Sequence, residues 1–182
     1  MTRLLLISAI ASSLCAPLLA QDNNSQFGTT NPDEMTWQSF RQRAKDGDTD
    51  MVLCSMGYMM TKSGDHDTAR LIFENCANAG YTGAMTWMSQ LDNNGLGGEY
   101  DPEASARWDR RAAESGDPVG KFNHGLNLIR GHGISQNTEL GRKFVDEAAD
   151  DGLPIANRMR DADYDLDEVT PDADNWKYAP SG

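Results

Sequence analysis

Two cysteines, Cys54 and Cys76, carry the clearest chemical signal in the sequence. The other cysteine, Cys15, lies in an N-terminal segment that we expect to be removed, so the mature count is even. An even count in an exported chain favours a disulfide. Both cysteines lie at a similar separation from Gly64, so a helix pair turning there would bring them to the same height. We predict a Cys54–Cys76 disulfide, with two buried free thiols as the alternative.

Alternate acidic residues near the C-terminus offer oxygen ligands to a divalent cation. Asp161, Asp163, Asp165 and Asp167 take positions 1, 3, 5 and 7 of a calcium-loop frame. That frame also needs glycine at position 6 and glutamate at position 12, where this chain has Leu166 and Asp172. We therefore expect a solvated acidic segment, and keep the four aspartates as a candidate cation site.

The remaining reactive residue types form no catalytic pattern. His66, His124 and His132 are not spaced as a metal pair on one helix face, and no His-Glu-x-x-His motif occurs. Neither Gly-x-Ser-x-Gly nor, in the mature chain, Ser-x-x-Lys is present. The glycines at 95–98 close a helix, whereas a phosphate cradle must open one. We expect no catalytic residue and no cofactor.

The elements that would position these residues repeat along the chain. Gly47, Gly80, Gly116 and Gly152 each end a helix-like run, at intervals of 33, 36 and 36 residues. A period of this length is typical of helix-pair repeats, which stack because one pair cannot bury its apolar stripe alone.

The later units align without a gap. Each has a Gly-x-Gly turn after its first helix, and Asp101 or Asn137 then caps the start of the second. Gly116 and Gly152 favour a left-handed end to the second helix. The pattern predicts units at about 48–80, 81–116 and 117–152, between capping half-repeats near 36–45 and 155–162.

This pattern resembles the Sel1-like repeat, a relative of the tetratricopeptide repeat. The matching positions of the second unit are Ala84, Gly95, Gly97, Asp101, Trp108, Ala112, Ala113 and Gly116. Those of the third unit are Gly125, Leu128, Gly131, Gly133, Ile134, Phe144, Ala148, Ala149 and Gly152. Ser89, Asp92 and His124 depart from the pattern, replacing a glycine, an aromatic residue and a leucine. The resemblance implies an all-α fold, an α/α superhelical solenoid of helix-turn-helix repeats over residues 34–162.

The resemblance also implies a function without catalysis. It points to an adaptor or regulator that binds a protein or peptide through the concave face lined by the first helices. By analogy with related repeats, the groove positions are Tyr58, Lys62, Gln90, Asn94, Phe122, Leu126 and Arg130. The apolar Phe122 and Leu126 indicate either a contact patch or packing against the neighbouring unit. Some cysteine-rich relatives bridge helix pairs by disulfides.

Two other functions remain open. Some cysteine-rich relatives are named β-lactamase-like, so hydrolysis of a β-lactam or of the cell wall is one alternative. A structural protein that binds divalent cations through the acidic segment is the other.

The N-terminal residues have the pattern of an export signal. Arg3 precedes an apolar stretch, and Ala20 supplies a small residue before Gln21, so we predict a signal peptide over residues 1–20 cleaved after Ala20. We expect a flexible linker over 21–33, an acidic tail over 163–182, and a periplasmic or secreted protein. In that tail, Trp176 and Tyr178 are candidates to fold back onto the stack.

Charge narrows the range of partners. The chain has 28 acidic and 16 basic residues, a net charge of −12. Such a surface repels nucleic acid and anionic lipid and favours a basic protein partner. No second apolar run is long enough to span a membrane, so we expect no membrane insertion after signal cleavage.

Overall fold

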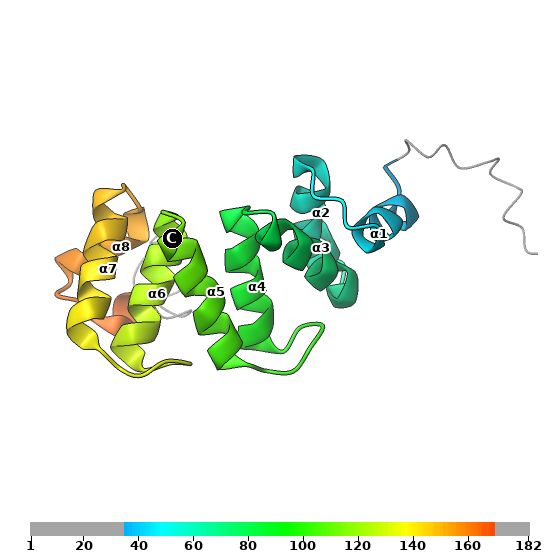
Figure 1. Cartoon of the computed structure of the whole chain (residues 1–182). Coiled ribbons are helices and arrows are strands. Elements are labelled where there is room, and N and C mark those ends of the chain that lie inside the picture. Colours follow the sequence, from blue (N-terminus) through cyan, green and yellow to red (C-terminus); the bar gives the residue numbers. More distant parts are fainter. Residues whose placement is uncertain (1–34, 170–182) are drawn as a thin grey trace, which may run out of the picture. The chain divides into compact units, whose positions relative to one another are not determined.

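The computed structural model describes residues 35–169, and every regular element in that range is helical (Figure 1). The elements are α1 (Trp37–Lys45), α2 (Met51–Lys62), α3 (His66–Asn78), α4 (Thr82–Asn94), α5 (Pro102–Glu114), α6 (Pro118–Arg130), α7 (Thr138–Asp150), α8 (Pro154–Asp161) and the 3-10 helix η2 (Leu166–Val169). The all-α prediction is confirmed.

Local capping explains where the helices begin and end. The Asp101 side chain accepts a hydrogen bond from the backbone N–H of Ala104, and the Asn137 side chain accepts one from Leu140. Gly116 and Gly152, which follow α5 and α7, have φ values of +86° and +90°. These left-handed positions let the chain reverse into the next helix.

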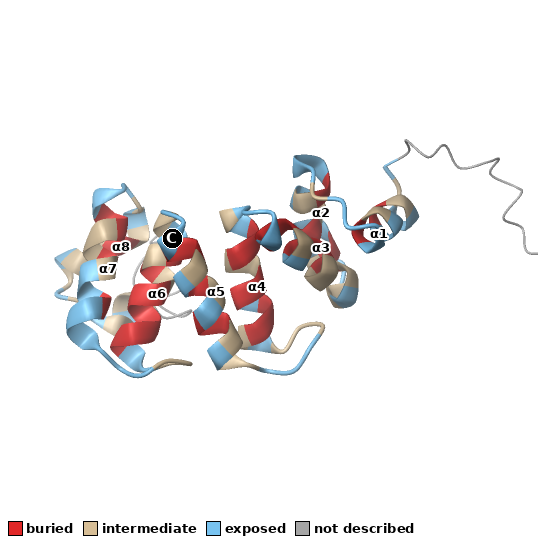
Figure 2. Cartoon of the chain, in the orientation of Figure 1, coloured by how far each residue is buried: buried red, intermediate tan, exposed pale blue. Residues whose placement is uncertain are grey.

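Each helix packs mainly against its neighbours in the sequence, as in a solenoid. The first helices of successive units also meet, since α4 contacts α6, while α1 packs against α3. Buried residues are red in Figure 2, and most of the apolar ones fall into two hydrophobic clusters. One cluster draws on α1 to α5 and the other on α6 to α8. The superhelical repeat fold is therefore confirmed.

The Gly-x-Gly turns do more than reverse the chain. Gly133 has φ +64°, and a Cβ atom there would lie 1.9 Å from the carbonyl oxygen of Pro102 in α5. A Cβ atom on Gly97 would lie 2.7 Å from the carbonyl oxygen of His66 in α3. Each turn therefore rests against the start of the preceding unit's second helix, which no larger residue would permit.

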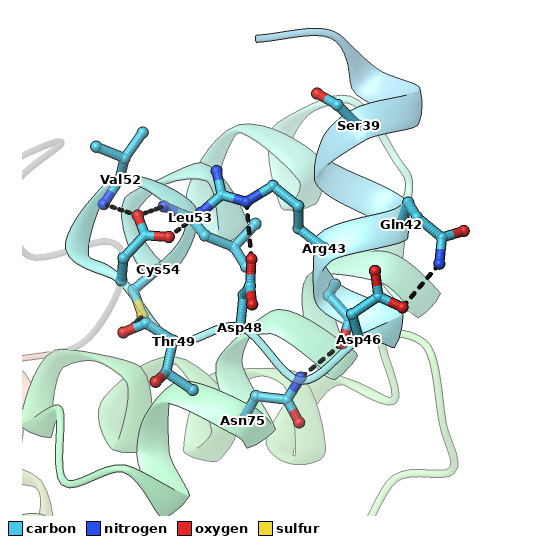
Figure 3. Close-up of polar contacts among 12 residues, drawn as sticks. Ser39, Gln42, Arg43, Asp46, Asp48, Thr49, Val52, Leu53, Cys54 and Asn75 are labelled. Atoms are coloured by element: carbon cyan, nitrogen blue, oxygen red, sulfur yellow. Dashed lines mark hydrogen bonds and ion pairs between the residues drawn. The ribbon is translucent and has the colours of Figure 1, made fainter. Parts of the chain in front are cut away.

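A disulfide and polar contacts hold the N-terminal end of the stack. Cys54 and Cys76 form the predicted disulfide between α2 and α3, with their Cα atoms 5.9 Å apart. Asn75 Nδ2 donates to the carbonyl oxygen of Ala44 at 2.7 Å, which ties α1 to α3 (Figure 3). Arg43 points toward Asp48, with its Nε 3.0 Å from a carboxylate oxygen.

Several predictions fall on other parts of the chain. The signal peptide, the linker over 21–33, and Trp176 and Tyr178 of the acidic tail lie outside the described residues. None of the helices between residues 35 and 169 combines the length and the apolar character needed to cross a membrane.

Candidate functional site

A polar cleft of about 300 Å³ opens among α4, α5, α6 and the turn after α6. Its lining is Ser89, Gln90, Asn93, Ser105, Asp109, Asn123, Leu126, Asn127, Arg130 and His132. Six polar side chains are buried among the described residues, and four of them, Ser89, Ser105, Asp109 and Asn127, line this cleft. Buried polar groups cost stability unless they are hydrogen-bonded, so their concentration at one opening marks a candidate site.

Asp109 forms the floor of the polar cleft. Its side chain is 3% exposed. Asn123 Nδ2 donates to Asp109 Oδ1 at 3.2 Å, and Asn127 Nδ2 donates to Asp109 Oδ2 at 2.8 Å. Burial raises the pKa of Asp109 to about 6, although hydrogen bonds from Ser89, Asn127 and Asn123 oppose that rise. At neutral pH, Asp109 at the floor of the polar cleft is therefore mainly a carboxylate, stabilised by hydrogen bonds from the two asparagine amides.

A pair of serines explains why the cleft opens at this level of the stack. The hydroxyl oxygens of Ser89 in α4 and Ser105 in α5 lie 2.9 Å apart. Gly125 and Gly141 occupy the equivalent positions 36 residues later. There α6 and α7 approach so closely that a Cβ atom on Gly125 would lie 2.8 Å from the Gly141 carbonyl oxygen. The serines prevent that approach between α4 and α5.

The rim of the polar cleft carries a cation that has no acidic partner among the residues that the structure describes. Arg130, at the end of α6, makes no ion pair or side-chain hydrogen bond with any residue in the described range. Desolvation by the surrounding side chains lowers the pKa of Arg130. Across the rim, His132 Nε2 lies 2.6 Å from Asn93 Oδ1. Because an amide oxygen only accepts, His132 Nε2 carries the proton in this contact.

An aromatic hollow of about 430 Å³ lies between α2 and α4. Its lining is Met51, Cys54, Ser55, Tyr58, Phe73, Tyr81, Thr82, Gly83, Ala84 and Trp87. The ring centroids of Tyr58 and Trp87 are 5.3 Å apart, and Trp87 stacks on Phe73 at 5.6 Å. Trp87 lies three residues before Gln90 on α4, so the aromatic hollow and the polar cleft adjoin along one helix.

The structure divides the predicted groove residues among three settings. Gln90, Leu126 and Arg130 come together at the polar cleft. Tyr58 lines the aromatic hollow, and Lys62 Nζ lies 5.4 Å from the Tyr58 ring centroid.

Two further predicted residues line neither the polar cleft nor the aromatic hollow. Asn94 Nδ2 donates to the Gln90 carbonyl oxygen near the end of α4. Phe122 is 4% exposed and belongs to the C-terminal hydrophobic cluster, so it offers no surface to a partner.

Sequence reasoning missed the residues that form the floor of the polar cleft. Ser105 and Asp109 are four residues apart, in register with the buried Ala112 of α5. Asn123 and Asn127 have the same spacing on α6. Polar residues at i and i+4 within an apolar register were the available signal, because such positions normally face a core.

Within residues 35–169, the aspartates of the acidic segment and the histidines are not gathered into a metal centre. In residues 35–169 no group of three or more His, Cys, Asp or Glu side chains is placed to hold a metal ion. Asp165 Oδ1 instead accepts a hydrogen bond from the backbone N–H of Asp167 at 2.9 Å. His124 packs edge-on against Phe144, with ring centroids 4.8 Å apart.

Comparison with known proteins supports the fold. No family model matches the sequence, and no curated protein matches it. Among solved structures, the chain is similar to a Sel1 repeat protein from Oxalobacter formigenes, with a TM-score of 0.56 and 22% identity over 68% of this chain and 96% of that one.

Two further solved structures agree. One is a protective antigen present in uropathogenic Escherichia coli strains and displaying an SLR fold (TM-score 0.55, 20% identity, 69% of this chain, 28% of that one). The other is cysteine-rich protein B of Helicobacter pylori (TM-score 0.55, 15% identity, 67% and 90%). The described helices therefore have the Sel1-like repeat fold, as predicted.

Proposed function

We propose that this chain, a helical solenoid with the Sel1-like repeat fold, is an exported, non-catalytic module that binds a protein or peptide across the face formed by α2, α4 and α6. The observation that carries the proposal is the concentration of buried polar side chains at the polar cleft. The fold does not require them, because glycines fill the equivalent positions of Ser89 and Ser105 in the next unit.

The chemistry of the polar cleft suits an extended peptide. Asn123 and Asn127 each use their amide nitrogen on Asp109, and their oxygens accept no hydrogen bond within the described residues. Gln90 is exposed at the rim, and neither the nitrogen nor the oxygen of its side-chain amide is hydrogen-bonded within the described residues. Side-chain amides both donate and accept, so they pair with the N–H and C=O groups of a peptide main chain. The net charge of −12 favours long-range encounter with a basic partner.

Peptide selection tests this proposal. A library of random 12-residue peptides displayed on phage would be enriched on the immobilised full chain. It would be enriched in parallel on Gln90→Trp, which places a large ring over the polar cleft, and on Lys143→Trp, which places the same ring on the exposed side of α7.

We expect peptides that bind the wild type and Lys143→Trp but lose at least about tenfold in affinity for Gln90→Trp. Peptides that bind all three proteins equally would place the binding surface elsewhere. Circular dichroism melting curves of both variants would establish that they remain folded.

Export is the second part of the proposal. The Cys54–Cys76 disulfide supports it, since disulfides persist in oxidising compartments. The mass of the protein recovered from a periplasmic extract or from the medium should correspond to a chain that begins at Gln21. Recovery only from the cytoplasm, with Met1 or Thr2 first and both thiols free, would contradict it.

A further inference from the structure

We infer that the partner peptide carries one large apolar side chain for the aromatic hollow and, a few residues away, one Asp or Glu side chain for Arg130. This inference rests on the function proposed above and specifies the chemistry of the peptide that the same face would recognise.

The aromatic hollow supplies the first contact. Met51 and Tyr58 lie seven residues, about two turns, apart on α2 and are 74% and 43% exposed. Trp87 forms the opposite wall, and the Gly83 position has no atom within 4 Å of where a Cβ would lie, so the hollow is open there. Exposed aromatic and methionine surface gains most from contact with a large apolar side chain, because both surfaces leave water.

Arg130 supplies the second contact. Lys62, Asn94 and Arg130 occupy equivalent positions at the ends of α2, α4 and α6. Neither Lys62 nor Arg130 forms an ion pair within residues 35–169, although the chain has 28 acidic and 16 basic residues. By contrast, Arg70 pairs with Asp92 at 2.7 Å. A partly desolvated, unpaired guanidinium is suited to a carboxylate, which it can bind through two parallel hydrogen bonds.

The position of Asp109 limits the carboxylate to the rim. A second acid beside the buried Asp109 would face a like charge at neutral pH, whereas Arg130 lies where the cleft meets solvent. A single acidic residue in the peptide is enough to pair with Arg130, whereas a run of acidic residues would be repelled by the net charge of −12. Helices in contact lie about 8–10 Å apart. Arg130 also lies seven residues further along its helix than Asn123, the position equivalent to Trp87, which adds an axial offset of about 10 Å. An extended chain rises about 3.3 Å per residue, so the two side chains should be roughly four to six residues apart.

Defined peptides test the inference. Fluorescein-labelled 12-residue peptides with a Gly-Ser background, blocked at both ends, would carry one Phe and one Glu at separations of four, five or six. Matched peptides would have Gln or Lys in place of Glu, or Ser in place of Phe. Fluorescence anisotropy on the full chain, with its disulfide intact, would give the affinities.

At the best separation we expect the Glu peptide to bind at least about tenfold more tightly than the Gln peptide. Arg130→Gln should abolish that ratio. The control, Arg107→Gln, should retain it, because Arg107 lies on α5 outside both hollows with its side chain 62% exposed. Tyr58→Ala should remove the preference for Phe over Ser. Both arginines are exposed, so neither change removes a core contact.

Other outcomes would overturn the inference. Equal binding of Glu and Gln peptides, tighter binding of the Lys peptide, or equally tight binding of a peptide with a free C-terminal carboxylate and no Glu would each contradict it. If phage-selected peptides depend on Gln90 yet lack a carboxylate, the inference fails and the proposed function stands. If no peptide depends on Gln90, the proposed function fails as well.

Discussion

Asp109 shows how one side chain sets the electrostatic character of the polar cleft. Burial raises its pKa to about 6, well above the ordinary 3.8. Between these two pH values, the Asp109 carboxyl is protonated to a greater extent in the folded protein than in the unfolded chain. The contribution of Asp109 to the free energy of unfolding is therefore greatest at low pH and is lost as the pH rises through about 6. A buried carboxylate that costs stability at neutral pH is what a binding site retains and a core avoids.

This sign gives a pH-dependent prediction for Asp109→Asn, which removes the titrating group. The free energy of unfolding of the wild type, minus that of the variant, should fall by on the order of 2–3 kcal/mol between about pH 4 and pH 7. Urea denaturation across that range measures it. Glu103→Gln, an exposed change on the same helix, is the control and should show no such decline. Parallel curves for the wild type and Asp109→Asn would contradict the raised pKa.

The Gly-x-Gly turn is the feature that joins elements of neighbouring units. Gly133 requires both a positive φ and the absence of a Cβ atom, because the Pro102 carbonyl oxygen occupies that space. Gly116 requires only the positive φ of +86°, since no atom lies within 4 Å of its Cβ position. Comparing substitutions at the two glycines therefore separates the energetic cost of the left-handed backbone from the cost of disturbing the contact between units.

We expect both Gly133→Ala and Gly116→Ala to destabilise the protein. The left-handed conformation alone costs about 1–2 kcal/mol in each. Gly133→Ala should lose at least about 2 kcal/mol more, because α5 must shift to accept the methyl group. Chemical denaturation of the matched variants gives the difference, and equal losses would show that the turn does not support the stacking of units.

The disulfide acts at the level of one helix pair. Cys54 and Cys76 are 22 residues apart and link α2 to α3. Closing a loop of that length stabilises a chain by about 3 kcal/mol in the chain-entropy model. Reduction should lower the free energy of unfolding of the wild type by about that amount, and should not change that of the double variant Cys54→Ala/Cys76→Ala. If reduction leaves the free energy of unfolding of the wild type unchanged, α2 and α3 are held together by packing alone.

Sequence reasoning worked best for features that depend on a few adjacent residues. Asp101 and Gly116 mark the two ends of α5 through their own side chain and backbone, so the helix could be placed without knowing its neighbours. The polar cleft depends instead on which faces of α4, α5 and α6 meet. Ser89 was recognised only as a departure from the repeat, because its contact with Ser105 exists only once α4 and α5 are packed together.

The molecule as a whole divides its core into two hydrophobic clusters. Leu53 and Met60 of α2 belong to the N-terminal cluster, whereas Val145 and Met159 belong to the C-terminal one. In a solenoid each helix contacts mainly its neighbours, so a defect in one cluster should spread only as far as the adjacent elements.

Two matched core changes test this locality. Met159→Ala and Met60→Ala each remove a side chain with no exposed surface and should each cost about 2–5 kcal/mol. By hydrogen exchange, Met159→Ala should accelerate amides of α7 and α8 and spare those of α2 and α3, and Met60→Ala should do the reverse. Uniform acceleration in either variant would mean that the described helices unfold as one cooperative unit.

The central claim is that the polar cleft among α4, α5 and α6 binds a peptide. The most direct measurement is a nuclear magnetic resonance titration of the isotope-labelled chain with a phage-selected peptide. We predict that the largest shifts fall on the side-chain amides of Gln90, Asn123 and Asn127 and on the backbone around Arg130. Shifts centred on the outer faces of α3, α5 and α7, with those amides unmoved, would contradict the claim.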